Sequence, residues 1–283
     1  MIKNIQVILL LVVVSLTGIN AKSLRVEPND LSNNLESYII LDTRSPEFFK
    51  LGHIKRARNF PIDLTYEHLQ KNGKLTNPIR MQKVIRGLGL SNDSKVVIYD
   101  DGTFFDATRL FWALEVYGFT DVKLLNSGYD NWKSLDYKTS TKDIPIKASK
   151  YVAQINSTRL ATKFTTQIAT RNPNQLIIDA RPNQAYVGEV SSAARFGHIP
   201  KAVNFPASHN INYQKKHAEL KNVDTLKELY KDVDKSKKIV IYCAIGRIAT
   251  TNYFELRELD YNVANYDASW KEWGNDSSLP ITK

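Results

Sequence analysis

The 283-residue sequence contains an internal duplication, so the chain is expected to contain two copies of one fold. Several short segments of the first half return in the same order in the second half. They are IILDTR at 39–44 and LIIDAR at 176–181, GHI at 52–54 and GHIP at 197–200, NFP at 59–61 and 204–206, and VVIYD at 96–100 and IVIYC at 239–243. A tryptophan-bearing turn closes each copy, NSGYDNW at 126–132 and DASWKEW at 267–273.

Each copy alternates short apolar runs with helical patterns, which is typical of an α/β sheet with helices on both faces. The runs at 38–41 and 96–99 are apolar throughout, as expected of strands buried in a parallel sheet. A helical pattern follows the second strand of each copy, with its apolar face formed by Leu110, Ala113, Leu114 and Tyr117 in the first copy and by Tyr253, Leu256 and Leu259 in the second. The sequence therefore predicts two tandem domains, each a parallel sheet flanked by helices.

One polar stretch sets the expected domain boundaries. Residues 135–158 contain Pro145 and several lysines and lack clear periodicity, which favours a linker. Domain 1 is then expected over residues 22–134 and domain 2 over residues 159–283. A composition of 42% hydrophobic and 24% charged residues can supply a core for each.

The N-terminus has the pattern of a secretory signal peptide over residues 1–21. Lys3 precedes an apolar run at 5–16, and a short stretch of small and polar residues ends at Ala21. The run is shorter than the roughly 20 residues that a membrane-spanning helix needs. A buried N-terminal element and an uncleaved anchor are the alternatives. We expect export, to a bacterial periplasm, and no membrane contact once the signal is removed.

The net charge of +10 is spread along the chain. No interleaving of aromatic and basic residues accompanies it, which argues against a nucleic-acid partner. A basic surface of this kind suits small anionic substrates. The only cysteine is Cys243. A lone cysteine in an exported chain is either incidental or a reactive thiol.

The surroundings of Cys243 favour a reactive thiol over a buried small side chain. Cys243 ends the apolar run 239–242, and the segment CAIGRI at 243–248 separates that run from the following helix. Ligands of open α/β sheets bind beyond the carboxyl ends of strands. A loop entering a helix presents free amides and the positive end of the dipole, which stabilise a thiolate. Gly246 lets the loop curl so that its amides point inward, and Arg247 adds a positive charge.

These motifs resemble the tandem-domain rhodanese family, the thiosulfate and 3-mercaptopyruvate sulfurtransferases. The resemblance rests on DAR at 179–181, GHIP at 197–200, the six-residue loop after Cys243, and ASW at 268–270. It implies that Cys243 carries sulfur as a persulfide and that no metal or organic cofactor takes part. Asp100 stands at the cysteine position of the first copy, so domain 1 is expected to be catalytically silent.

The resemblance also assigns roles around the loop. The residues expected to bind the anionic donor or the persulfide are Arg181, Arg247, Arg195, Ala244, Ile245, Gly246 and Ile248. Asp179 is expected to orient loop amides or Arg181. A structural salt bridge is the alternative for Arg181 and Arg195. His53 and His198 recur in both copies, including the silent one, and are expected to be structural.

The loop sequence bears on the donor. No side-chain hydroxyl is present in CAIGRI to relay a proton to a mercaptopyruvate carbonyl, which favours thiosulfate as donor, with cyanide or a thiol as acceptor. A 3-mercaptopyruvate sulfurtransferase and a non-catalytic module that binds an anion or a protein are the alternatives. A cysteine phosphatase would need arginine six residues after the cysteine, where the chain has Ala249.

Overall fold

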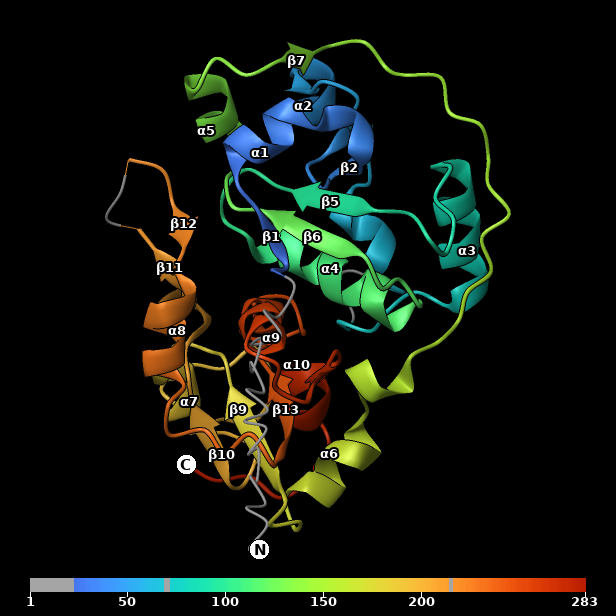
Figure 1. Cartoon of the computed structure of the whole chain (residues 1–283). Helices are drawn as coiled ribbons and strands as arrows, with labels where there is room; N and C mark the ends of the chain where they lie inside the picture. Colours follow the sequence, from blue (N-terminus) through green and yellow to red (C-terminus); the bar gives the residue numbers. More distant parts are fainter. Residues whose placement is uncertain (1–22, 69–71, 214–215) are drawn as a thin grey trace, which may run out of the picture.

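The computed structural model describes residues 23–68, 72–213 and 216–283 and divides them into two lobes, one for each copy of the repeat (Figure 1). The predicted signal segment 1–21 lies outside these residues. Within them, no helix is both long enough and apolar enough to span a bilayer.

Domain 1 is a five-stranded parallel sheet in the order β1-β6-β5-β2-β4. Its strands are β1 (Arg25–Val26), β2 (Ile39–Asp42), β4 (Arg58–Asn59), β5 (Val96–Tyr99) and β6 (Val122–Leu125). The short strands β3 (His53–Ile54) and β7 (Thr139–Ser140) pair antiparallel beside it. Its helices are α1 (Pro28–Asn33), α2 (Pro46–Leu51), α3 (Pro78–Gly87), α4 (Phe105–Val116) and α5 (Tyr129–Ser134), with 3-10 turns at Leu35–Ser37 and Ile62–Thr65.

Domain 2 repeats this sheet in the order β10-β9-β13-β14-β8, again with all strands parallel. Its strands are β8 (Leu160–Ala161), β9 (Gln175–Asp179), β10 (Ala202–Asn204), β13 (Lys238–Tyr242) and β14 (Val263–Tyr266). A hairpin of β11 (Ile211–Asn212) and β12 (Glu219–Leu220) projects from it. Its helices are α6 (Lys163–Ala169), α7 (Asn183–Tyr186), α8 (Val223–Leu229), α9 (Ala249–Glu258) and α10 (Ser269–Trp273), with 3-10 turns at Ser157–Arg159 and Ala207–Asn210. The predicted fold class is confirmed.

The two histidines of the repeat are structural, as expected. Nδ1 of His53 lies 2.9 Å from the carbonyl oxygen of Phe49, and Nδ1 of His198 lies 2.9 Å from that of Tyr186. Each imidazole also stacks on the ring of the same residue, with centroids 3.8 Å and 3.9 Å apart. The same contacts recur in the domain that lacks a cysteine, so they serve the fold.

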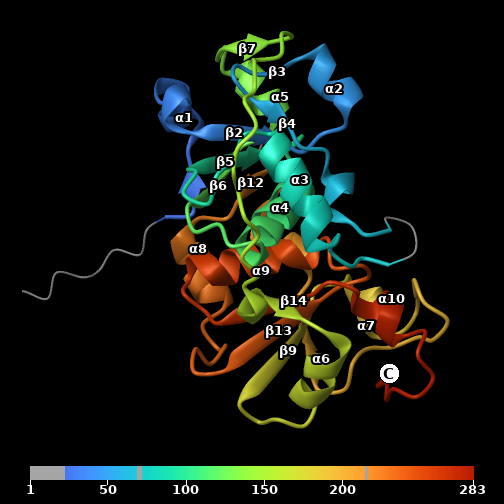
Figure 2. The same cartoon turned by 90° about the vertical axis from the view of Figure 1, so that its right-hand side faces the viewer.

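The domains meet along α4 and α9, which lie against each other between the two sheets (Figure 1 and Figure 2). Phe111 of α4 meets Phe254 of α9 edge to face, with ring centroids 4.9 Å apart. The Thr108 and Thr250 hydroxyl oxygens are 3.0 Å apart. Each of these helices follows the central strand of its own sheet, so the interface brings the two strand ends, and the loops after them, to the same region.

The connection between the domains crosses the surface of domain 1 (Figure 1). Residues 141–156 form neither helix nor strand. The amide of Ser149 donates to the carbonyl of Arg86 at 3.0 Å, and the Tyr151 hydroxyl donates to the carbonyl of Tyr117 at 2.5 Å. Within the stretch predicted as linker, residues 139–140 form β7 and pair with β3 of domain 1.

Candidate functional site

Cys243 directly follows β13 at the carboxyl edge of the domain 2 sheet, where it is 1% exposed. The turn at the start of α10 fixes its backbone on both sides. Its amide donates to the Ser269 hydroxyl at 3.1 Å, and its carbonyl accepts from the amide of Trp270 at 3.0 Å. The closing turn of the repeat therefore holds the cysteine in place.

The loop after Cys243 is shaped by Gly246, whose φ of +64° is unfavourable for residues with a side chain. A Cβ there would lie 2.3 Å from the carbonyl oxygen of Asp267. The amides of residues 244–248 donate no hydrogen bond to the part of the chain that the structure describes. Free amides on a loop that leads into α9 form a cradle for an anion.

The equivalent loop of domain 1 is filled by a side chain of its own. The Asp100 carboxylate accepts hydrogen bonds from the amides of Gly102 at 2.8 Å, Phe104 at 3.2 Å and Ala107 at 3.3 Å. Burial and the neighbouring Asp101 raise the pKa of Asp100 to about 7, although the hydrogen bonds from the Gly102 and Ala107 amides act to lower it. A cavity of about 660 Å³, lined in part by Arg44 and Asp100, opens beside this loop. Domain 1 thus has the equivalent loop, but the Asp100 carboxylate occupies its amides.

Arg181 is buried and held by Asp179 through a two-pronged ion pair, with Nε and Nη2 at 2.9 Å and 2.6 Å from the carboxylate oxygens. Its guanidinium lies over the Trp270 ring, 4.6 Å from the centroid. Arg44 and Asp42 repeat the ion pair in domain 1, so the pair is part of the fold. Nη1 of Arg181, however, is buried and has no partner among the described residues, so it is available to an anion.

Arg247 lies at the domain interface. Its Nε donates to the Asp106 carboxylate of α4 at 2.5 Å, and its side chain is 40% exposed. The remaining loop positions contribute backbone. Ala244 accepts from the amide of Lys271 at 2.9 Å, and Ile248 packs against the core that both domains share.

Arg195 is hydrogen-bonded within domain 2, which favours the structural alternative over the expected anion ligand. Its guanidinium donates to the carbonyls of Gly274 at 3.1 Å, Leu279 at 2.7 Å and Trp273 at 2.8 Å, and also to that of Asp276. These carbonyls belong to the chain that follows α10. The guanidinium therefore holds the C-terminal segment in place, which is a structural role.

Domain 1 contributes residues to the site that the sequence did not single out. Arg109 of α4 is fully buried and donates to the carbonyls of Gly246 at 2.8 Å and Gly73 at 2.7 Å. The backbone at Gly73 is so close to the loop that a Cβ would lie 1.9 Å from the carbonyl oxygen of Ile245. The sequence shows an arginine within the otherwise apolar α4, but Gly246, the partner that connects it to the loop, lies in the other domain.

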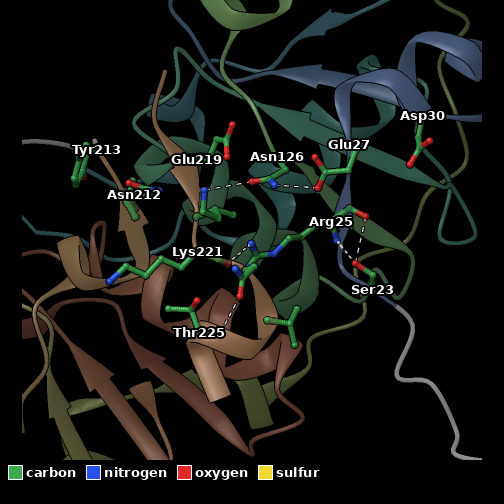
Figure 3. Close-up of a pocket in the computed structure, with 14 residues that line it drawn as sticks. Ser23, Arg25, Glu27, Asp30, Asn126, Asn212, Tyr213, Glu219, Lys221 and Thr225 are labelled. Atoms are coloured by element: carbon green, nitrogen blue, oxygen red, sulfur yellow. Dashed lines mark hydrogen bonds between the residues drawn. The ribbon is translucent and has the colours of Figure 1, made fainter. Parts of the chain in front are cut away.

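A separate polar cavity of about 1010 Å³ lies between β1 and the β11–β12 hairpin (Figure 3). Asn126 bridges the domains there, accepting from the Leu220 amide at 3.3 Å and donating to Glu27 at 2.9 Å. Arg25 donates to the carbonyl of Lys221 at 2.6 Å. None of the residues lining this cavity belongs to the Cys243 loop, and its polar contacts fasten the two domains together.

The fold and the site together define a two-domain α/β protein with one cysteine loop whose amides are unpaired within the described residues and one loop filled by aspartate. The family profile described as rhodanese-like domain matches residues 27–135 and 161–276. The chain belongs to the rhodanese family, with two tandem copies of its domain.

Similar proteins of the family are named as sulfurtransferases or as a sulfur carrier. The chain is 30% identical over 237 residues to the 3-mercaptopyruvate sulfurtransferase of Escherichia coli, covering 81% of this chain and 83% of that protein. It is 31% identical over 246 residues to a putative thiosulfate sulfurtransferase of Saccharopolyspora erythraea, covering 81% and 84%. A sulfur carrier protein of Thermus thermophilus is 31% identical over 217 residues, covering 71% and 75%.

Solved structures show the same fold. The 3-mercaptopyruvate sulfurtransferase of Escherichia coli superposes with a TM-score of 0.77 at 27% identity, covering 88% of this chain and 100% of that one. An anaerobic ergothioneine biosynthesis enzyme of Chlorobium limicola gives a TM-score of 0.82 at 20% identity, covering 92% and 70%. The second likeness concerns the fold alone.

Proposed function

We propose that this protein is a sulfurtransferase that moves a sulfane sulfur from thiosulfate to a thiophilic acceptor, cyanide or a thiol, through a persulfide on Cys243. The observation that carries the proposal is the contrast between the two loops. The loop of domain 2 presents a cysteine and unpartnered amides, whereas Asp100 occupies the amides of the domain 1 loop. The named relatives support sulfur transfer as the chemistry.

The transfer takes place in two steps. The Cys243 thiolate attacks the outer sulfur of thiosulfate, a new S–S bond forms on the enzyme, and sulfite leaves with the electron pair of the broken S–S bond. The acceptor then attacks the outer sulfur of the persulfide, and the thiolate leaves with the electrons of the bond to it. With cyanide the product is thiocyanate. This is covalent catalysis with a substituted-enzyme intermediate.

The loop amides and two arginines would supply the electrostatic stabilisation. Amides fixed before the reaction stabilise the persulfide anion without reorganising during the step. Nη1 of Arg181 is a buried donor without a partner, which favours an anionic donor at that position. Arg247 stands at the partly exposed rim, where its charge attracts anions despite the ion pair with Asp106. Asp179 orients Arg181.

The donor is the part of this proposal for which the relatives offer two choices. One relative is named for 3-mercaptopyruvate and another for thiosulfate. The loop residues Ala244, Ile245 and Ile248 provide no side-chain hydroxyl to protonate the enolate that leaves when the C–S bond of mercaptopyruvate breaks. We therefore favour thiosulfate and keep 3-mercaptopyruvate as the second candidate. Export through the N-terminal segment 1–21 is part of the same proposal.

The test compares the mature protein with its Cys243→Ser variant. We expect thiocyanate from thiosulfate and cyanide with the first and none with the second. Intact mass after thiosulfate alone is expected to rise by one sulfur atom in the protein with Cys243 only. Asp100→Ser, the matched change in the silent loop, is expected to retain the added sulfur.

Each negative result has a defined meaning. Sulfur loading by mercaptopyruvate but not by thiosulfate would transfer the assignment to the second donor. Failure of both donors to load Cys243 would overturn the enzymatic proposal and favour a module that binds an anion or a protein.

A further inference from the structure

Domain 1 places a tyrosine beside the catalytic loop of domain 2. Tyr66 lies on an arm of domain 1 (residues 65–68 and 72–76), where it bridges antiparallel to Leu75. The arm rests on domain 2, because the amide of Leu75 donates to the Asp267 carboxylate at 2.8 Å and Gly73 abuts Ile245. Tyr66 is 2% exposed.

Arg109 connects Tyr66 to the loop that follows Cys243. The Arg109 guanidinium lies over its ring, 4.1 Å from the centroid, and the same guanidinium donates to the carbonyl of Gly246. Burial raises the pKa of Tyr66, Arg109 and Arg247 oppose the rise, and the charges of Asp106 and then Cys243 add to it. The phenol is therefore protonated at neutral pH, where it can donate a hydrogen bond.

The Tyr66 hydroxyl is exceptional among the fully buried tyrosines. Its oxygen is buried and has no hydrogen-bond partner within the described residues. The hydroxyls of the other fully buried tyrosines all donate to a protein oxygen; these are Tyr99, Tyr117, Tyr151, Tyr230, Tyr242, Tyr253 and Tyr266. A buried polar group without a partner is costly, so it calls for a ligand that completes it.

We propose that the Tyr66 hydroxyl donates a hydrogen bond to the outer sulfur of the Cys243 persulfide, so that the silent domain supplies a catalytic residue. The inference rests on the proposed function. Addition of one sulfur extends the cysteine side chain by roughly 2 Å. The new terminal sulfur is an anion and accepts hydrogen bonds. No bond to a proton forms or breaks on Tyr66; it stabilises the charge that arrives with the sulfur.

Tyr66→Phe tests this contact because it removes only the hydroxyl. We expect kcat/KM for the sulfur donor to fall about tenfold or more, as for other donors aimed at a developing anion. Without this donor the persulfide anion is less stable, so the pH profile of its reaction with cyanide is expected to move to higher pH. Thermal stability is expected to hold, because no protein partner is lost. Tyr137→Phe is the matched control, since Tyr137 packs on Trp132 within domain 1, outside the site.

The outcomes separate this inference from the proposed function. If wild-type protein acquires no sulfur from thiosulfate or mercaptopyruvate, the proposed function fails and Tyr66 loses its role with it. If wild type acquires sulfur and Tyr66→Phe shows the same kcat/KM and the same pH profile, the contact with the persulfide is refuted while the function stands. A loss confined to thermal stability would also overturn it, because it would reveal a structural partner.

Discussion

Gly246 shows how a single backbone position supports the loop. Its positive φ costs roughly 1–2 kcal/mol for a residue with a side chain, and a Cβ would meet the Asp267 carbonyl at 2.3 Å. The curled loop, and with it the direction of the amides, depends on the absence of that Cβ.

Gly246→Ala is therefore expected to destabilise the protein by more than about 1 kcal/mol and to lower sulfur loading at least tenfold. Denaturant unfolding and the rate of mass increase with thiosulfate measure the two effects. The control is Gly87→Ala at the end of α3, where a Cβ meets no atom within 4 Å. There the free energy of unfolding should stay the same or rise by a few tenths of a kcal/mol, as is usual for alanine in place of an exposed helical glycine. Equal behaviour of the two variants would contradict the account of the loop.

Among the elements, α4 has an effect beyond its own domain. It carries Arg109, which donates to the Gly246 carbonyl of the Cys243 loop and to the Gly73 carbonyl of the arm, and Asp106, which pairs with Arg247. Domain 1 thus forms part of the proposed catalytic site, which gives a physical reason for keeping a second copy of the domain without a cysteine.

Arg109→Met is expected to reduce sulfur transfer strongly even though it lies in the silent domain. Loss of its charged hydrogen bonds leaves the buried carbonyl of Gly73 unpaired and leaves that of Gly246 with only the Asn265 amide as donor, at a cost of about 1–3 kcal/mol. Arg257→Met serves as control, because Arg257 also joins the domains, through Glu115 at 3.0 Å, but is not hydrogen-bonded to the loop. Comparable losses of kcat/KM in both variants, after correction for folded fraction, would argue against a specific effect of Arg109.

At the scale of the whole molecule, the interface buries a charged cluster. Glu255 and Glu258 of α9 both pair with Arg25 of β1, and Glu255 is fully buried. Burial raises the pKa of Glu255 to about 8, with the charge of Glu258 adding to the rise and Arg25 opposing it. Its Oε1 has no partner among the described residues.

The pH dependence of stability follows from that pKa. A raised pKa means that the folded state binds more protons than the unfolded chain between the ordinary pKa of 4.5 and about 8. The contribution of Glu255 to the free energy of unfolding is therefore full below this window and falls as pH rises through it, by up to about 1.4 kcal/mol per unit.

Glu255→Gln is expected to remove this decline and to be more stable than wild type near pH 8. Urea unfolding from pH 5 to pH 9 measures the profile. Glu36→Gln, at an exposed carboxyl, is the control and should follow wild type. Parallel profiles for wild type and Glu255→Gln would show that the carboxyl is charged throughout.

The sequence by itself determined the duplication, the α/β class, the structural histidines, and the position of Cys243 at the end of a buried strand opposite Asp100. Those features are local or repeated, so short stretches of sequence indicate them through strand periodicity and turn residues. The tertiary structure alone decided which side chains surround the loop. Arg109 meets Gly246 across 137 positions of sequence, Tyr66 lies against the guanidinium of the same Arg109, and Arg195 donates to backbone carbonyls. Such contacts arise because α4 and α9 pack together, and no short window of sequence encodes that docking.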